Sequence, residues 1–171
     1  MILTAASELA YHTVNCSALN AEELNREHGF DDLLDAFSRC ASVLSQSSKP
    51  MDMAVNVCLH CTRCFSVAAQ FTACRESFIK MPQLISDLVR VLTFKNLPKL
   101  CSEVVDCIGS FAGDARLQSQ LLKTKILWHL ISFCSIMISL LKNAALKDRK
   151  KPIIKKFGTN WQKHLSKLLQ G

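Results

Sequence analysis

Apolar residues recur at helical intervals along most of the chain. Between Phe30 and Leu44 they fall at positions 30, 33, 34, 37, 41 and 44, the i, i+3, i+4, i+7 pattern of a helix with one buried face. Only five glycines and four prolines interrupt the 171 residues, too few for the tight turns of a sandwich or barrel. The sequence therefore predicts an all-α fold, with long helices near 30–46, 51–70, 82–94, 97–112 and 125–141.

Local signals predict where some of these helices begin and end. Asn20, followed three residues later by Glu23, resembles a capping box. Gly29 is then expected to end a short helix over 21–28, and the Lys49-Pro50 pair to close the helix that begins near Phe30. The helices should be short and closely spaced.

The same apolar pattern returns along the chain. The stretch Cys64–Lys80 aligns with Cys107–Lys123 at a constant shift of 43. A second set of four apolar residues, Phe30, Leu33, Leu34 and Phe37, recurs twice. At a shift of 51 it aligns with Met81, Leu84, Ile85 and Leu88, and at a further shift of 46 with Leu127, Leu130, Ile131 and Cys134. Periods of about 40 to 47 residues are typical of armadillo and HEAT arrays. We therefore expect an armadillo/HEAT-like helical repeat solenoid of about three degenerate units over residues 1–141, itself part of something longer.

The charge is divided unevenly between this body and the end of the chain. Residues 1–141 hold 12 basic and 13 acidic residues, a net charge of −1, whereas residues 142–171 hold 9 basic and 1 acidic, a net charge of +8. The whole chain has a net charge of +7 but does not have the even basicity of a nucleic-acid-binding domain, and we expect no nucleic acid as a partner.

The basic tail, residues 142–171, has two interpretations. Its lysines alternate with apolar residues, and a short cationic amphipathic helix after Gly158 would suit an anionic membrane or an acidic partner. The other interpretation is a solvated end.

The segment CLHCTRC, residues 58–64, raises the question of a metal site. On a helix, cysteines three apart step by roughly 300° and climb one face, so they do not surround one metal ion. A second Cys-x-x-Cys is absent from the sequence, and we expect no metal ligands and no cofactor. Cys58, Cys61 and Cys64 are instead predicted to be small buried residues, with His60 pointing into solvent.

Other chemistry is not indicated. The first residues lack the features of a signal peptide, so nine cysteines indicate a reducing, cytoplasmic compartment. The five histidines lie far apart, and no catalytic constellation is recognisable, so we expect no enzymatic activity. The apolar run 126–141 is shorter than the roughly 20 residues that span a bilayer. It is predicted to be a buried helix, although a small membrane-associated protein using residues 126–157 remains an alternative.

Longer phrases resemble a known family. These are ALNAEELNREHGFDDLLDAFSRCASVL, VCLHCTRCFSVAAQFTACRESFIKMPQLISDLVRVL and LQSQLLKTKILWHLISF, between about Ala10 and Phe133. They are similar to the armadillo-like region of the large endosomal DnaJ-homologue proteins (subfamily C) of receptor-mediated endocytosis. After Phe133 the acidic, tyrosine-containing continuation of that family is replaced by CSIMISLLKNAALKDRKKPIIKK.

The resemblance implies a protein-interaction scaffold in an endosomal trafficking cochaperone, peripheral on the early endosome membrane and active in endosome-to-Golgi sorting. The implied partners are a sorting nexin, the endosomal actin-regulating complex and, through the full-length protein, a heat-shock cognate chaperone. The His-Pro-Asp tripeptide of a J domain is absent from the sequence, so stimulation of the chaperone is not expected of this chain. The alternative is a generic armadillo-like adaptor.

Overall fold

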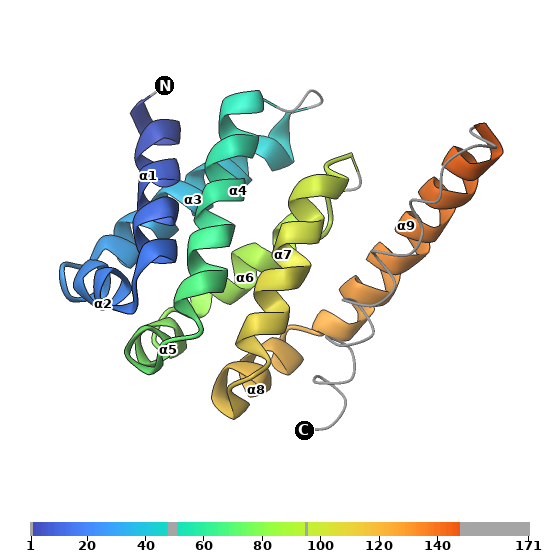
Figure 1. Cartoon of the computed structure of the whole chain (residues 1–171). Helices are drawn as coiled ribbons and strands as arrows, with labels where there is room; N and C mark the ends of the chain where they lie inside the picture. Colours follow the sequence, from blue (N-terminus) through green and yellow to red (C-terminus); the bar gives the residue numbers. More distant parts are fainter. Residues whose placement is uncertain (1, 48–50, 95, 148–171) are drawn as a thin grey trace.

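The computed structural model describes residues 2–47, 51–94 and 96–147, and within these ranges it contains nine α-helices and no strand (Figure 1). An all-α fold was predicted, and it is confirmed for the described residues. The helices are α1 (Ile2–Cys16), α2 (Ala18–Arg26), α3 (Gly29–Gln46), α4 (Asp52–Ala68), α5 (Thr72–Ile79), α6 (Pro82–Val91), α7 (Pro98–Phe111), α8 (Ala115–Lys123) and α9 (Ile126–Lys147).

Helices of similar length pack beside one another. The long helices α1, α4 and α7 form one row, with α4 in contact with both of its neighbours, and Figure 1 shows the three side by side. The short helices α2, α5 and α8 form a second row in which α5 contacts α2 and α8. Behind α4, α3 packs against both α4 and α6. Helix α9 contacts α7 and α8 and leans away from the other helices.

The five predicted long helices correspond to α3, α4, α6, α7 and α9, which differ from the predicted ranges by a few residues at either end. Helix α9 continues to Lys147, beyond the expected end at 141. Helices α1, α5 and α8 were not predicted as separate elements. The Lys49-Pro50 stop and the amphipathic helix after Gly158 lie outside the described residues.

The predicted capping box at Asn20 is wrong. Helix α2 begins earlier, after Ser17, whose side-chain oxygen accepts a hydrogen bond from the backbone N–H of Leu19 at 3.1 Å. Gly29 does not end this helix either, because His28 adopts the left-handed conformation (φ 60°) and Gly29 begins α3. A Cβ on Gly29 would lie 2.2 Å from Leu24 Cδ1, so a larger residue there would require the Leu24 side chain to move.

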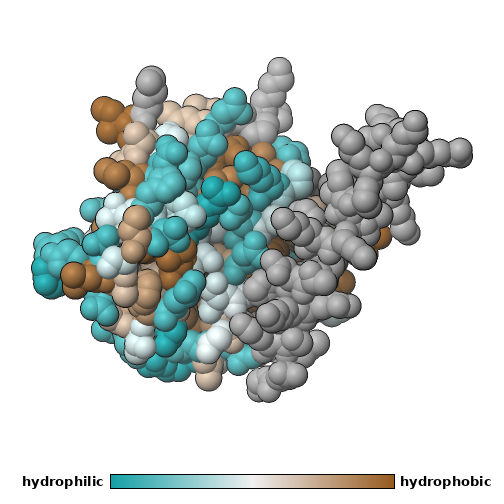
Figure 2. All heavy atoms as spheres, viewed as in Figure 1, coloured by the Kyte–Doolittle hydropathy of each residue, from teal (hydrophilic) through white to brown (hydrophobic). Residues whose placement is uncertain are grey.

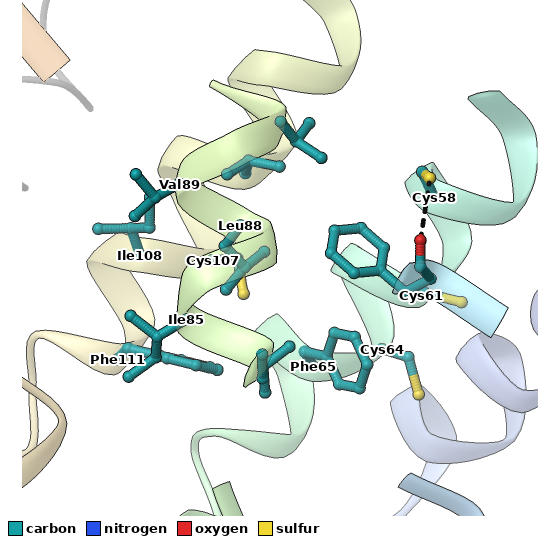
Figure 3. Packing of buried hydrophobic residues seen from close by; sticks show 14 of the residues in the cluster. Cys58, Cys61, Cys64, Phe65, Ile85, Leu88, Val89, Cys107, Ile108 and Phe111 are labelled. Carbon is teal, nitrogen blue, oxygen red and sulfur yellow. Dashed lines mark hydrogen bonds between the residues drawn. The ribbon is translucent and has the colours of Figure 1, made fainter. Parts of the chain in front are cut away.

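Aromatic rings join the helices at the centre of the core. Phe78 of α5 lies 5.1 Å from the ring of Phe30 in α3, 5.8 Å from Phe65 in α4 and 5.5 Å from Phe111 in α7. All four side chains are buried, and Figure 3 shows Phe65 and Phe111 within the surrounding cluster. One residue of the short α5 thus connects three long helices through its ring.

Two polar networks connect neighbouring helices. Between α3 and α6, the buried carboxylate of Asp87 accepts a hydrogen bond from the Ser38 hydroxyl at 2.5 Å and lies 3.0 Å from Arg90. At the surface between α5 and α8, Arg116 donates two hydrogen bonds to Glu76, at 2.6 and 3.1 Å. In the first network the Asp87 side chain is fully buried between α3 and α6, whereas in the second both Arg116 and Glu76 are exposed to solvent.

Candidate interaction surface

The row of α1, α4 and α7 presents a band of polar side chains, which we name the α1–α4–α7 face. In the view of Figure 2, hydrophilic residues are spread over the side on which these helices lie in Figure 1. The face is defined by two residues from each helix, of which Glu8, His12 and Lys99 are exposed and the other three partly buried. The six residues are Glu8, His12, His60, Arg63, Lys99 and Glu103.

Arg63 of α4 connects all three helices of the row. Its Nη2 lies 2.5 Å from the Glu103 carboxylate of α7, and its guanidinium carbon lies 5.9 Å from the centre of the Tyr11 ring of α1. The hydrogen bond to Glu103 raises the pKa of Arg63 above its usual range, so the cation is maintained. One turn further along, the hydroxyls of Ser66 and Ser110 lie 3.1 Å apart and join α4 to α7 a second time.

His60 is half-buried on this face, which corrects the expectation that it points into solvent. Its Nδ1 is shielded from water and makes no hydrogen bond. Burial lowers the pKa of His60, and the nearby positive groups Arg63 and Lys99 act in the same direction, whereas Glu8 opposes them. Near neutral pH the imidazole is therefore neutral and sits among charged neighbours.

The cysteines of CLHCTRC lie on the opposite, inner side of α4. Cys58, Cys61 and Cys64 are fully buried, which confirms the prediction of burial, and Figure 3 shows them along one helix. The Cys58 thiol donates a hydrogen bond to the Phe37 carbonyl oxygen of α3 at 3.9 Å. Within the described residues, no group of three or more His, Cys, Asp or Glu side chains has the arrangement of a metal site.

We expect the thiols to divide into reactive and protected sets. Burial raises the pKa of Cys64 to about 12 and of Cys74 and Cys101 to about 11, so their reactive thiolates are scarce near neutral pH. Cys16 is exposed, and the neighbouring Cys58 thiol, aided by the positive charge of Arg39, lowers the pKa of the half-buried Cys40 to about 7. In native protein, iodoacetamide should therefore modify Cys16 and Cys40 first.

Peptide mapping by mass spectrometry over a time course would measure this order. The same experiment in denaturant is the control, since all nine cysteines should then react at similar rates. Native modification of Cys64 or Cys101 as fast as that of Cys16 would contradict the burial described for α4 and α7.

The predicted buried helix at 126–141 is buried on one side only. In α9, Ile126, Leu130 and Phe133 are buried, whereas Trp128 and Ile131 are exposed. Among the described residues, no single helix has the length and hydropathy to cross a membrane. Only α8 taken together with residues 126–139 of α9 meets those criteria, and this pair is bent by 77° at the break between the helices.

The α1–α4–α7 face was not identified from the sequence. Arg63 and Glu103 are 40 positions apart in the chain, and each is an ordinary charged residue in its own helix. The sequence signal that could have indicated their contact is the shift of 43 that aligns Cys64 with Cys107. If the two aligned stretches belong to neighbouring repeat units, the residues near Arg63 and those near Glu103 lie on adjacent helices. The class defined by fold and face is an all-α protein with a polar surface built from three adjacent helices.

Comparison with known proteins gives a partial relationship. The chain is 32% identical over 130 residues to DnaJ homolog subfamily C GRV2 of Arabidopsis thaliana. The match covers 76% of this chain but 5% of that protein, so the chain corresponds to about one twentieth of the relative's length. No family model matches the chain. No solved structure matches it either. The resemblance to DnaJ subfamily C is thus confirmed as a distant, partial similarity.

Proposed function

We propose that this chain is a protein-binding segment of an armadillo-like helical solenoid in an endosomal trafficking cochaperone. The order of helix lengths supports the solenoid. A short helix followed by two longer ones occurs first as α2, α3 and α4 and again as α5, α6 and α7. The short α8 and the long α9 begin the same order a third time. Helices at the same place in the order pack together in the pairs α2 and α5, α5 and α8, α3 and α6, and α4 and α7, whereas α9 packs against α7 and α8. Such stacking is how armadillo arrays bury apolar faces that a single unit leaves open.

The observation that carries the binding role is the α1–α4–α7 face. Arg63 and Glu103 of this face are held in place before any partner arrives, because the Arg63 guanidinium pairs with the Glu103 carboxylate and lies over the Tyr11 ring. A surface that is already ordered loses little conformational entropy on binding, which favours the docking of a weakly structured protein segment. We propose no catalytic activity for the chain, and we place its role in presenting this face.

The trafficking role rests on the similarity to a DnaJ subfamily C protein. We propose a sorting nexin and the endosomal actin-regulating complex as partners, with the full-length protein on the cytoplasmic side of early endosomes. Stimulation of a chaperone would belong to a J domain elsewhere in such a protein. A generic adaptor with the same face and other partners is the second candidate, favoured by the small share of the relative that the match covers.

Direct binding of the full chain to purified sorting nexins and to the actin-regulating complex would test this proposal. The exposed Lys99 lies on the face and the exposed Lys80 lies between α5 and α6, so Lys99→Glu and Lys80→Glu form a matched pair of charge reversals. We expect Lys99→Glu to weaken binding by about tenfold and Lys80→Glu to leave it unchanged. Equal binding by both variants would show that the α1–α4–α7 face is not the binding surface. If the wild-type chain bound none of these proteins, the proposed trafficking partners would be wrong.

A further inference from the structure

Helix α9 carries apolar residues on two opposite sides, with the exposed Ser135 among those of the outer side. Its inner side packs against α7 and α8 through Ile126, Leu130 and Phe133, which are all buried. On its outer side, Trp128 is 73% exposed, and Ile131 and Ile138 are 54% and 53% exposed. At 100° per residue these three positions fall within an arc of about 80°. A helix with apolar residues on both sides is expected to meet an apolar environment on both sides.

Two exposed lysines lie in the sequence directly before α9. Lys123 and Lys125 flank the turn between α8 and α9, and both are exposed. Leu122, 41% exposed, joins them at the end of α8. We name these six residues the α9 outer face: Leu122, Lys123, Lys125, Trp128, Ile131 and Ile138.

The charge of the chain changes sign where this face begins. Residues 1–114 contain 9 basic and 13 acidic residues, a net charge of −4, whereas residues 115–171 contain 12 basic and 1 acidic residue, a net charge of +11. Between Asp114 and Asp148 the sequence has no acidic residue at all. An occupant that offers an apolar interior together with a negatively charged surface would match both the exposed apolar residues and the positive charge of this part of the sequence.

We propose that the α9 outer face docks onto an anionic lipid membrane, with α9 lying in the interface. An indole ring with an apolar body and a polar N–H suits the boundary between headgroups and acyl chains, where Trp128 would sit. Lysines beside it gain from the negative potential of anionic headgroups. A further layer of protein helices would cover the isoleucines, but it would not account for a run of sequence in which every charge is positive. The proposal does not depend on the protein partners proposed above.

Tryptophan fluorescence tests this proposal in the full chain. The chain contains two tryptophans, Trp128 and Trp161, so Trp161→Phe leaves Trp128 as the only reporter. We expect vesicles of equimolar phosphatidylcholine and phosphatidylserine to shift the Trp128 emission to the blue, and bromine-labelled acyl chains to quench it. Vesicles of phosphatidylcholine alone should produce neither change.

Matched substitutions in the Trp161→Phe background separate the two contributions. Each lysine is expected to contribute roughly fivefold to the affinity for anionic vesicles. Replacing both Lys123 and Lys125 with Gln should therefore weaken binding by more than about tenfold. Ile131→Ser with Ile138→Ser should weaken it by about tenfold. Leu19→Ser on α2, where the leucine is 70% exposed, and Lys80→Gln are the controls and should leave binding unchanged. Circular dichroism of each variant checks that the helices are retained.

Three outcomes would overturn the proposal. The first is the absence of any binding to anionic vesicles. The second is binding that leaves the Trp128 emission unchanged, because the basic residues 142–171 alone would then hold the lipid. The third is a Trp128 emission that is already shifted to the blue without lipid: a shift that depends on protein concentration would assign the face to a second copy, and one that does not would assign it to another part of the same chain.

Discussion

Phe78→Ala is expected to lower the free energy of unfolding by about 3–5 kcal/mol. The ring is fully buried and contacts the rings of Phe30, Phe65 and Phe111, which belong to three different helices. Its removal leaves a cavity where α3, α4, α5 and α7 meet, and α5 has only Cys74 as a second fully buried side chain. A loss of this size is a large fraction of the stability of an average domain.

Urea denaturation followed by far-ultraviolet circular dichroism would measure this loss. Trp128→Ala is the matched control, because it removes a larger aromatic ring from a side chain that is 73% exposed, and it should change stability by no more than about 0.5 kcal/mol. If the two variants were equally stable, the aromatic cluster would not be the centre of the core.

Asp87→Ala is expected to have the second-largest effect, a loss of about 2–3 kcal/mol. The Asp87 carboxylate is fully buried, and its removal leaves the Ser38 hydroxyl without its acceptor and Arg90 without its ion-pair partner. The value lies below that of a fully buried ion pair, because the Arg90 side chain is 41% exposed and water would partly replace the lost contact.

The exposed ion pair of Asp35 and Arg39 in α3 supplies the control for this experiment. Its atoms lie 2.7 Å apart, closer than those of Asp87 and Arg90, but both side chains are more than half exposed. Asp35→Ala should therefore change the midpoint of urea denaturation very little, with a loss below about 0.5 kcal/mol. Equal losses for the two aspartates would mean that burial does not set the strength of the Asp87 contact.

The sequence predicts the helices that have broad apolar stripes. Phe30, Leu33, Phe37 and Leu44 repeat with a helical period, and all are buried in α3. The shift of 43 that aligns Cys64–Lys80 with Cys107–Lys123 also aligns the sequence of α5 with that of α8, although neither segment was predicted to be a helix. Periodicity was informative where many side chains of one helix face the core.

Periodicity failed where few side chains of a helix are buried. In α1 only Ser7 and Val14 are fully buried, and Ile2 and Leu9 are exposed, so its hydrophobic pattern does not describe its buried side. The α1–α4–α7 face could not be predicted for a different reason. Its contacts, such as that of Arg63 with the Tyr11 ring, depend on how separate helices are placed, and no local pattern contains that information.

The buried cysteines of α4 and α7 have a kinetic consequence. Cys61, Cys64 and Cys107 keep their thiols reduced only while the helices remain packed, because oxidants reach them only when the core opens. Each opening therefore exposes groups whose oxidation adds polar atoms that the closed core has no room to accept. Oxidation during a brief opening would keep the core from closing until the thiol is reduced again, so we expect the working lifetime of this protein under oxidising conditions to depend on how often it opens as well as on its equilibrium stability.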